Sequence, residues 1–354
     1  MARDAVVRVA LAGYGLAGRV FHAPLIAATP GMSLDLVVTG NAERAAQVAT
    51  DHPGADVVAS TDDLFGRASD FDLLVVATTN DVHSSLTLAA LAAGKAVVVD
   101  KPVATSSADA RRVVEAAEEA GLLLTVFQNR RWDSDVLTLQ RLRESGELGD
   151  VLRFESRFER WRPEIRDGAW RELLTGEQGG GLLLDLGSHL VDQALHLFGP
   201  ARRVYAEVDA RRGASDDDVF VAIEHVSGTH SHLWAGALAG SPGPRLRVLG
   251  TRAAYVVDGL DGQEDALRAT GHPAIGGFAE PDERWGRVVR GSDVTSVPTE
   301  PGRWDSFYPL VATALAGAGP VPVDPRDAVR ALELIEAARR SAREHQVVEL
   351  QDLP

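Results

Sequence analysis

The sequence contains no cysteine, which excludes disulfide bonds, a thiolate nucleophile and zinc bound by cysteine. No apolar run reaches the length of a membrane-spanning helix, so no membrane partner is expected. Positive charge is in deficit: the formal net charge is −15, which argues against a nucleic acid as the main partner. The chain passes within a few residues of Met1 into a strand-like run, so we expect no signal peptide and a cytoplasmic protein.

What is present is an ordinary globular composition. The 354 residues are 45% hydrophobic and 25% charged, and at about 150 residues per domain this length predicts two domains. Short apolar runs alternate with helix-like segments through residue 127 and predict strands at 6–12, 34–39, 72–77, 96–99 and 122–127. Residues 1–127 are therefore predicted to form a doubly wound parallel α/β sheet, a Rossmann domain.

The pattern changes in the second half. Residues 204, 206 and 208, and again 219, 221 and 223, are apolar and alternate with other residues, and Gly-bearing turns such as Ser227-Gly228 and Gly250-Thr251 join such runs. We therefore expect residues 128–354 to form an α+β domain on a large, mainly antiparallel open sheet, with a final helix at 324–344. The uncovered face of that sheet is the expected contact of a homodimer or homotetramer.

A glycine-rich loop directly follows the first predicted strand. It reads Gly13-Tyr14-Gly15-Leu16-Ala17-Gly18, the G-x-G-x-x-G pattern of a dinucleotide fold. The first glycine allows the tight turn, the second admits the pyrophosphate, and the third lets helix and strand pack closely. Gly13, Gly15, Leu16, Ala17 and Gly18 are therefore predicted to bind a nicotinamide cofactor.

The end of the second strand indicates which cofactor. Asp35 has the usual spacing for a ribose ligand but lies near the start of its strand, whereas ligands bind beyond the carboxyl ends. The residues there are Thr39, Asn41 and Arg44, and no acid directly follows the strand to repel a 2′-phosphate. This favours NADP, with NAD as the second choice; the alternative is that Arg44 is only a solvated helix residue.

Two further strand ends carry polar residues that are expected in the same crevice. Thr78, Thr79, Asn80 and His83 follow the third strand, and Asp100-Lys101-Pro102 follows the fourth. Since a lysine beyond a strand end of a nucleotide fold points to the ligand, we predict that Lys101 faces the crevice beside Pro102. The alternative for a single lysine is a solvated surface charge.

The stretch from Gly179 to Asp192 contains three glycines, an apolar run, Asp185 and His189. The glycines let another group approach the backbone closely. If a helix begins near Asp185, with Ser188 as its N-cap, Asp185 and His189 lie on one side of its first turn. A carboxylate there would fix the imidazole tautomer and favour its cation, as a general base requires. The alternative is an aspartate at a helix start and a structural histidine.

Other clusters of polar and aromatic residues are weaker indications of a functional site. His230 and His232 share one face of a predicted strand, but no third metal ligand is identifiable, and His189, Asp192 and His196 would need a ligand from elsewhere. We predict no metal site. A basic and aromatic cluster in a probable loop is either a rim over the crevice or surface packing; its members are Arg160, Trp161, Arg162 and Trp170.

These motifs together resemble the Gfo/Idh/MocA oxidoreductase family, whose signatures are G-x-G-x-x-G, Glu-Lys-Pro and a G-G-G…D-x-x-x-H segment. Asp100 stands where the family has Glu, with the charge kept. Residues 13–26, 129–133, 185–199 and 258–268 are similar to the NADP-dependent scyllo-inositol dehydrogenase subgroup, although Gly40-Asn41 replaces its usual Ser-Arg. The resemblance implies that Lys101, Asp185 and His189 are catalytic, and that these residues, with Asn129 and Arg131, contact the substrate.

The expected reaction is NADP-linked oxidation of a ring CH–OH of an inositol or sugar, or reduction of the matching ketone. His189 would remove the hydroxyl proton, Asp185 would orient His189 and bind the substrate, and Lys101 would donate to the reacting oxygen. One alternative is a non-catalytic NADP-sensing regulator, which needs only the glycine loop. Another is a glycoside hydrolase of the same family that uses its nicotinamide transiently.

Overall fold

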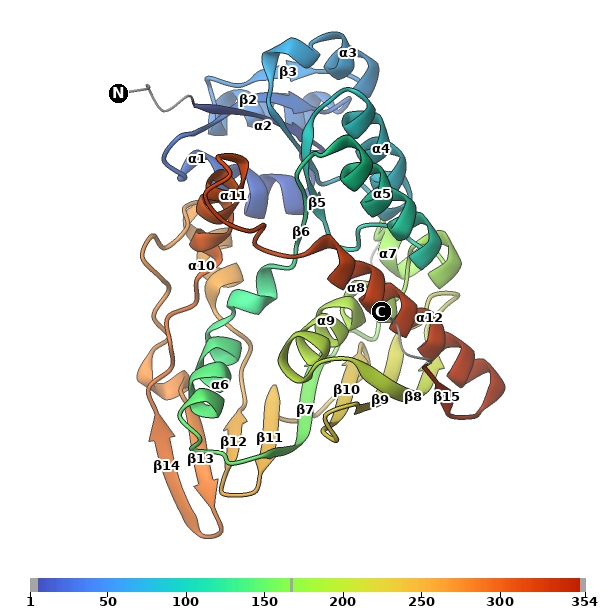
Figure 1. Ribbon diagram of the computed structural model, residues 1–354, viewed down its shortest axis with the longest axis vertical. Helices are drawn as coiled ribbons and strands as arrows, with labels where there is room; N and C mark the ends of the chain where they lie inside the picture. The colour runs from blue at the N-terminus through green and yellow to red at the C-terminus, as the bar shows by residue number, and fades with distance from the viewer. Residues whose placement is uncertain (1–5, 166–167, 351–354) are drawn as a thin grey trace.

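A six-stranded parallel sheet forms the first half of the protein, as predicted. The computed structural model describes residues 6–165 and 168–350, and its first sheet has the strand order β3-β2-β1-β4-β5-β6 (Figure 1). Its strands are β1 (Val7–Ala12), β2 (Met32–Val38), β3 (Asp56–Val58), β4 (Leu73–Val76), β5 (Ala96–Asp100) and β6 (Leu124–Phe127). The helical segments of this half are η1 (Ala17–His22), α1 (Ala23–Ala27), α2 (Ala42–Asp51), α3 (Thr61–Gly66), α4 (His83–Ala92) and α5 (Ser107–Ala120). The prediction missed β3, which has three residues, two of them exposed, and so leaves no apolar run in the sequence.

The predicted ligand motifs all lie at one edge of this sheet. The strand order reverses between β1 and β4, which is where doubly wound sheets open a crevice beyond the carboxyl ends of their strands. The glycine loop follows β1, Thr39 follows β2, Thr78 follows β4 and Lys101 follows β5. Parallel strands therefore bring these four segments to a common crevice.

The three glycines of the first loop have different surroundings. A Cβ atom added to Gly13 would overlap the carbonyl oxygen of Ala77, and one added to Gly18 would overlap the carbonyl oxygen of Gly13. A Cβ atom on Gly15 would meet no atom within 4 Å. Gly13 and Gly18 are thus required by the packing of the protein itself, whereas Gly15 borders open space into which a pyrophosphate fits.

A nine-stranded, mainly antiparallel sheet forms the second half. Its order is β14-β13-β12-β11-β7-β10-β9-β8-β15, and only β7 and β10 pair in parallel. The strands are β7 (Val151–Glu159), β8 (Ala201–Asp209), β9 (Asp218–His225), β10 (His230–Gly236), β11 (Leu246–Gly250), β12 (Ala254–Val257), β13 (Gly286–Arg290), β14 (Asp293–Val297) and β15 (Val348–Glu349). The predicted alternation is confirmed in the register of β8 and β9, where Val204 pairs with Ile223, Ala206 with Val221 and Val208 with Val219.

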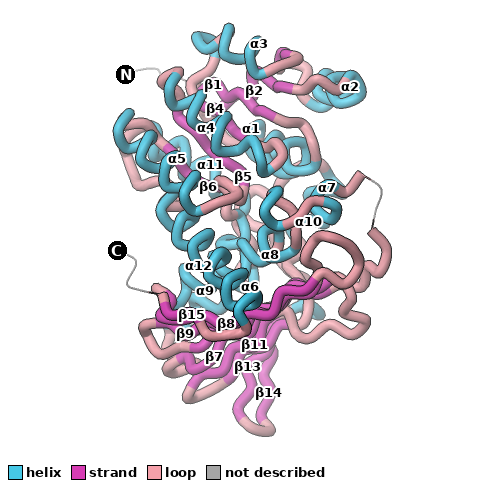
Figure 2. The backbone as a smooth tube through the Cα atoms, turned by 90° about the vertical axis from the view of Figure 1, so that its right-hand side faces the viewer, coloured by secondary structure: helices cyan, strands magenta, loops and turns pink. Residues whose placement is uncertain are grey.

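Helices cover one face of this second sheet. Helices α6, α9 and α12 lie on the face turned toward the first sheet, and no helix of the described residues covers the opposite face (Figure 2). The helices of this half are α6 (Ser134–Glu144), α7 (Trp170–Leu173), α8 (Leu182–Asp185), α9 (Gly187–Phe198), α10 (Gln263–Thr270), α11 (Phe307–Leu315) and α12 (Pro325–Glu344). None of the described helices is both long and apolar enough to cross a membrane.

Helix α11 belongs in space to the first sheet rather than the second. Its Phe307, Tyr308 and Val311 share one apolar core with residues of β1, and it lies beside α1 in the upper part of Figure 1. Thr125 of β6 donates a hydrogen bond to the carbonyl of Val323, after α11. The division predicted at residues 127 and 128 assigned this segment to the second domain, because nothing in its composition distinguishes it. The chain crosses between the two sheets several times.

The glycine loop gives a test of these packing arguments. Gly18→Ala should lower the free energy of unfolding by about 1–3 kcal/mol, since the new methyl group must displace the Gly13 carbonyl. Gly15→Ala, the matched control in the same loop, should stay within about 0.5 kcal/mol of the parent protein. Urea unfolding of both variants measures the difference. Equal losses of stability would contradict the distinction drawn between the two glycines.

Candidate active site

An ion pair joins the two halves of the protein at the mouth of the crevice. The Lys101 Nζ atom donates to Asp185 Oδ1 at 2.8 Å and to the Asp185 carbonyl oxygen at 2.7 Å, across 84 residues of sequence. Asp100 Oδ1 accepts the backbone N–H of Lys101 at 2.9 Å, and the Lys101-Pro102 peptide bond is cis. The lysine at the end of β5 thus faces the crevice, as predicted, and binds the end of α8.

The glycine run allows Asp185 to reach this position. A Cβ atom on Gly180 would overlap the Leu174 carbonyl, and one on Gly181, whose φ is +88°, would overlap the Asp216 carboxylate. Asp216 Oδ2 accepts the backbone N–H of Leu183 at 2.7 Å, which satisfies the start of α8. The close approach predicted for these glycines is therefore made by protein groups, which fix where α8 begins.

The charges around Asp185 hold its carboxylate ionised. Burial alone would raise the pKa of Asp185, but Lys101 and then Arg171 outweigh it and lower that pKa to about 2. Arg171 Nε lies 3.5 Å from Asp185 Oδ1, and its guanidinium lies 4.3 Å from the Trp170 ring centroid. Asp185 is thus an anion shared by two cations.

His189 lies one turn further along and does not bind Asp185. It is 6% exposed, its ring meets Phe158 edge-on at 6.2 Å, and its Nδ1 atom is buried without a hydrogen-bond partner among the described residues. Burial first, and then the charges of Lys101, Arg130 and Arg245, lower the pKa of His189 well below its ordinary value.

The predicted Asp185–His189 contact, and the stabilised imidazolium it implied, are therefore wrong. Lys101 and Arg171 draw the carboxylate away, and the surrounding cations favour the neutral imidazole. Ser188 is also not an N-cap: it lies within the first turn of α9 and its Oγ atom donates to the Asp185 carbonyl at 3.0 Å. The spacing of two residues along a helix does not indicate which cations from other segments will bind the carboxylate.

Two residues predicted to bind the cofactor form hydrogen bonds that hold loops together. The ring nitrogens of the buried His83 lie 2.7 Å from the Pro102 carbonyl oxygen and 3.3 Å from the Thr78 carbonyl oxygen. Asn80 Nδ2 donates to the Gly179 carbonyl at 2.9 Å, which ties the first sheet to the glycine run of the second half. Thr79 is exposed and Thr78 partly exposed at the same edge.

The residues after β2 leave a cation available for a phosphate. Asn41 caps α2, with its Oδ1 atom accepting the Arg44 N–H at 2.9 Å, and Thr39 Oγ1 accepts the Asn41 N–H at 3.3 Å. The guanidinium of Arg44 is exposed and forms no hydrogen bond or ion pair within residues 6–165 and 168–350. This edge of the first sheet therefore combines an exposed cation after β2 with open space beside Gly15.

Arg130, not Arg131, turns toward His189. Arg131 binds Asp192 through two hydrogen bonds of 2.8 and 2.6 Å and Asp327 through a third of 3.0 Å, so its predicted contact with substrate is not supported. Asn129 is buried, and no described side chain hydrogen-bonds to its amide. Arg130 and Arg245 were missed: two adjacent arginines look alike in sequence, and Arg245 follows a Pro-Gly-Pro turn that carries no catalytic signal.

The basic and aromatic cluster reaches the site at one end. Trp161 is 62% exposed and bridges to Leu238 across a strand edge, whereas Trp170 adjoins Arg171 and, through it, Asp185. Trp170 therefore lies next to a cation that adjoins Asp185, while Trp161 lies on the surface. Residues 166–167, between them, lie outside the described residues.

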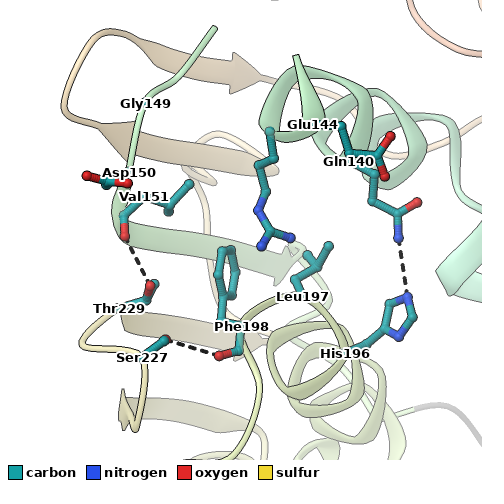
Figure 3. A pocket seen from close by; sticks show the side chains of 11 residues that line it. Gln140, Glu144, Gly149, Asp150, Val151, His196, Leu197, Phe198, Ser227 and Thr229 are labelled. Carbon is teal, nitrogen blue, oxygen red and sulfur yellow. Dashed lines mark hydrogen bonds between the residues drawn. The ribbon is translucent and has the colours of Figure 1, made fainter. Parts of the chain in front are cut away.

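A separate cavity of about 590 Å³ lies at the opposite end of α9 (Figure 3). Gln140 points toward His196 there, with 3.2 Å between the amide nitrogen and Nε2, and Phe198 forms part of the wall. None of the predicted catalytic residues lines it. Within the described part of the chain, no three His, Asp or Glu side chains converge as metal ligands, and Asp192 is bound to Arg131.

The fold and site agree with comparisons to known proteins. Residues 7–128 match the oxidoreductase family with an NAD-binding Rossmann fold, and residues 136–256 match the GFO/IDH/MocA C-terminal domain. The oxidoreductase YdgJ of Escherichia coli is 40% identical over 95% of this chain and 96% of its own, and the NADP(+) scyllo-inositol 2-dehydrogenase IolW of Bacillus subtilis is 33% identical over 98% and 96%.

Solved structures show the same architecture. The oxidoreductase yvaA of Bacillus subtilis superposes with a TM-score of 0.91 at 32% identity, over 99% of this chain and all of its own. The oxidoreductase YPO2259 of Yersinia pestis gives 0.89 at 38% identity over the whole of both chains. One family model matches the first sheet and the other matches much of the second. The chain therefore belongs to the Gfo/Idh/MocA family of NAD(P)-binding oxidoreductases.

Proposed function

We propose that the protein is an NADP-dependent dehydrogenase that oxidises a ring CH–OH of an inositol or sugar, or reduces the matching ketone. The observation that carries the proposal is the ion pair of Lys101 with Asp185 at the carboxyl end of β5, with His189 one turn further along and near enough for the Lys101 charge to lower its pKa. Two relatives support the substrate class, since one is a scyllo-inositol dehydrogenase and the other a D-apiose dehydrogenase.

The three side chains divide the work. When bound, the nicotinamide accepts or gives the hydride. His189, uncharged because of its lowered pKa, takes the hydroxyl proton; its Nδ1 atom is enclosed, so the transfer falls to Nε2. The Lys101 ammonium donates to the reacting oxygen and stabilises the negative charge that develops there. Asp185 holds the ammonium in place, and its remaining oxygen can accept a substrate hydroxyl.

The direct test uses the purified protein, NADP and a panel of inositols and hexoses. Net appearance of NADPH absorbance with at least one polyol supports a dehydrogenase. Cleavage of a glycoside without net reduction would instead identify a hydrolase. Binding of NADP with no turnover in either direction would favour the regulator, since Lys101, Asp185 and His189 would then have no reaction to serve.

Replacement of His189 tests its role as the base. His189→Gln should lower kcat by on the order of 10²- to 10⁴-fold while NADP binding, measured by fluorescence, is unchanged. His196→Gln, on the same helix but at the far cavity, is the matched control. In the parent enzyme kcat/KM should stay level as pH falls from 8 to about 6.5, because the lowered pKa keeps the base neutral over that range. It should decline only at lower pH. A variant that keeps near-normal turnover would exclude His189 as the base.

Arg44 should decide the preference for NADP. Arg44→Gln should raise KM for NADP about 10- to 100-fold, the value of a lost charge-assisted hydrogen bond, and leave KM for NAD unchanged. Arg112→Gln, an exposed arginine of α5 that pairs with Asp109, serves as control. Equal use of NAD and NADP by the parent enzyme would contradict the proposal.

We further propose a homodimer or homotetramer formed through the uncovered face of the nine-stranded sheet. On β10, Ser231, Leu233 and Ala235 are buried toward the helices, so His232 and Trp234 face the other way. Trp234 packs on its cross-strand partner Phe220 with ring centroids 5.1 Å apart, and the Arg157 guanidinium lies 3.8 Å from the Trp234 ring centroid. Aromatic rings with an arginine are typical of interface centres.

Sedimentation velocity tests the interface. Trp234→Glu should convert the parent oligomer to a smaller species, because it places a charge at the centre of the proposed contact. Leu310→Glu, an exposed apolar residue of α11, should leave the oligomer intact. A monomeric parent protein, or an oligomer unchanged by Trp234→Glu, would contradict the proposed surface.

A further inference from the structure

One aromatic ring brings His189 together with two arginines. The ring of the buried Phe158 lies edge-on to the His189 ring at 6.2 Å. The guanidinium carbon of Arg245 is 4.3 Å from the centroid of the same ring, and that of Arg130 is 5.0 Å away. Both cations are favourable over an aromatic face and are thereby held on the ring that His189 also meets.

The helix that carries His189 also fixes both arginines. Gln193, one turn after His189, accepts a hydrogen bond from Arg245 Nη2 at 3.0 Å and donates to the Arg130 carbonyl at 2.9 Å. Arg245, only 2% exposed, also donates to Ser156 Oγ and lies 3.4 Å from Asp135 Oδ2.

Arg130 is held from the other side. Its guanidinium binds Asp133 at 3.3 Å and Glu264 at 2.9 Å. Two separate sets of contacts therefore hold two guanidinium groups against Phe158.

No carboxylate of the described residues forms an ion pair with His189, although Asp133 and Glu264 bind Arg130 and Asp135 lies against Arg245. The titratable groups on the elements packed around His189 are Lys101 after β5, Asp185 of α8, Arg130 and Arg131 of η4 (Asn129–Trp132), Arg153, Glu155, Arg157 and Glu159 of β7, Asp192 and His196 of α9, His230 and His232 of β10, Arg245 before β11, and Arg326, Asp327, Arg330, Glu333, Glu336, Arg339, Arg340, Arg343 and Glu344 of α12. Asp185 is bound by Lys101, and Asp192 and Asp327 are bound by Arg131. Glu155 pairs with Arg157 and Arg247.

We propose that Arg130 and Arg245, clamped on Phe158, are positioning residues that keep His189 uncharged, so that it can accept a proton over the whole neutral pH range. The inference rests on the proposed function, in which His189 is the base. A base that titrated at the ordinary histidine value would be largely protonated and inactive on the acid side of neutrality. The lowered pKa of His189, due first to burial and then to the cations, agrees with the geometry.

The test compares Arg130→Gln with Arg130→Lys. The first removes the charge and the second keeps it, so the His189 pKa should rise in Arg130→Gln and remain low in Arg130→Lys. Two measurements apply to each full-length variant: NMR titration of histidine-labelled protein, with His189→Gln to assign the signal, and the acid limb of the kcat/KM profile. Arg143→Gln is the control, because Arg143 lies 4.9 Å from the Phe198 ring at the other end of α9.

Arg245 needs a paired replacement. Arg245→Met alone leaves Asp135 buried and uncompensated, so the variant is combined with Asp135→Asn, and the pair should move the His189 titration in the same direction. An unchanged His189 pKa in Arg130→Gln and in the double variant would overturn the inference. If the His189 pKa rises in Arg130→Gln but the His189→Gln variant keeps full activity, the role of the arginines is supported and the proposed role of His189 as the base is contradicted.

Discussion

The ion pair between Lys101 and Asp185 is the contact on which the geometry of the site depends. It is short, largely shielded from solvent, and made by side chains from different halves of the protein. Breaking one partner would leave a buried charge uncompensated, which is far more costly than losing a surface pair. The Asn80 bond to the Gly179 carbonyl reinforces it within the same crevice. Together these contacts fix the glycine run of one half against the strand ends of the other.

The glycine run itself illustrates how a motif can be necessary for reasons other than ligand contact. The Leu174 carbonyl takes the space where a side chain of Gly180 would lie, and the Asp216 carboxylate takes that of Gly181. The missing side chains therefore make room for other groups of the protein. In the loop after β1, Gly13 and Gly18 likewise make room for backbone atoms of the protein, and Gly15 borders open space. A glycine motif thus combines positions that shape the site and positions that admit the ligand. Only coordinates separate the two.

Much of the fold and part of the site could be predicted from sequence. Strands of the first sheet are continuous apolar runs, and the motif at each strand end follows from the rule that ligands bind beyond the carboxyl ends. This placed Lys101 at the strand end where it lies, whereas the contact expected between Asp185 and His189 is wrong. The choice between Arg130 and Arg131 was missed because it depends on which acids α9 and α12 bring from far along the chain. The charge state of His189 was inverted for a similar reason: spacing identified one nearby carboxylate, whereas burial first, and then three cations from separate elements, lower the pKa of His189.

The return of α11 to the first sheet means that the chain passes between the two halves three times, at residues 128–133, 303–307 and 316–324. Two of these passages are bonded side by side, through the Arg303 N–H to the Trp132 carbonyl and the Trp304 indole to Asp133. Residues 307–315 therefore complete the apolar core of the first sheet, so a fragment that ended at residue 127 would leave that core open to water.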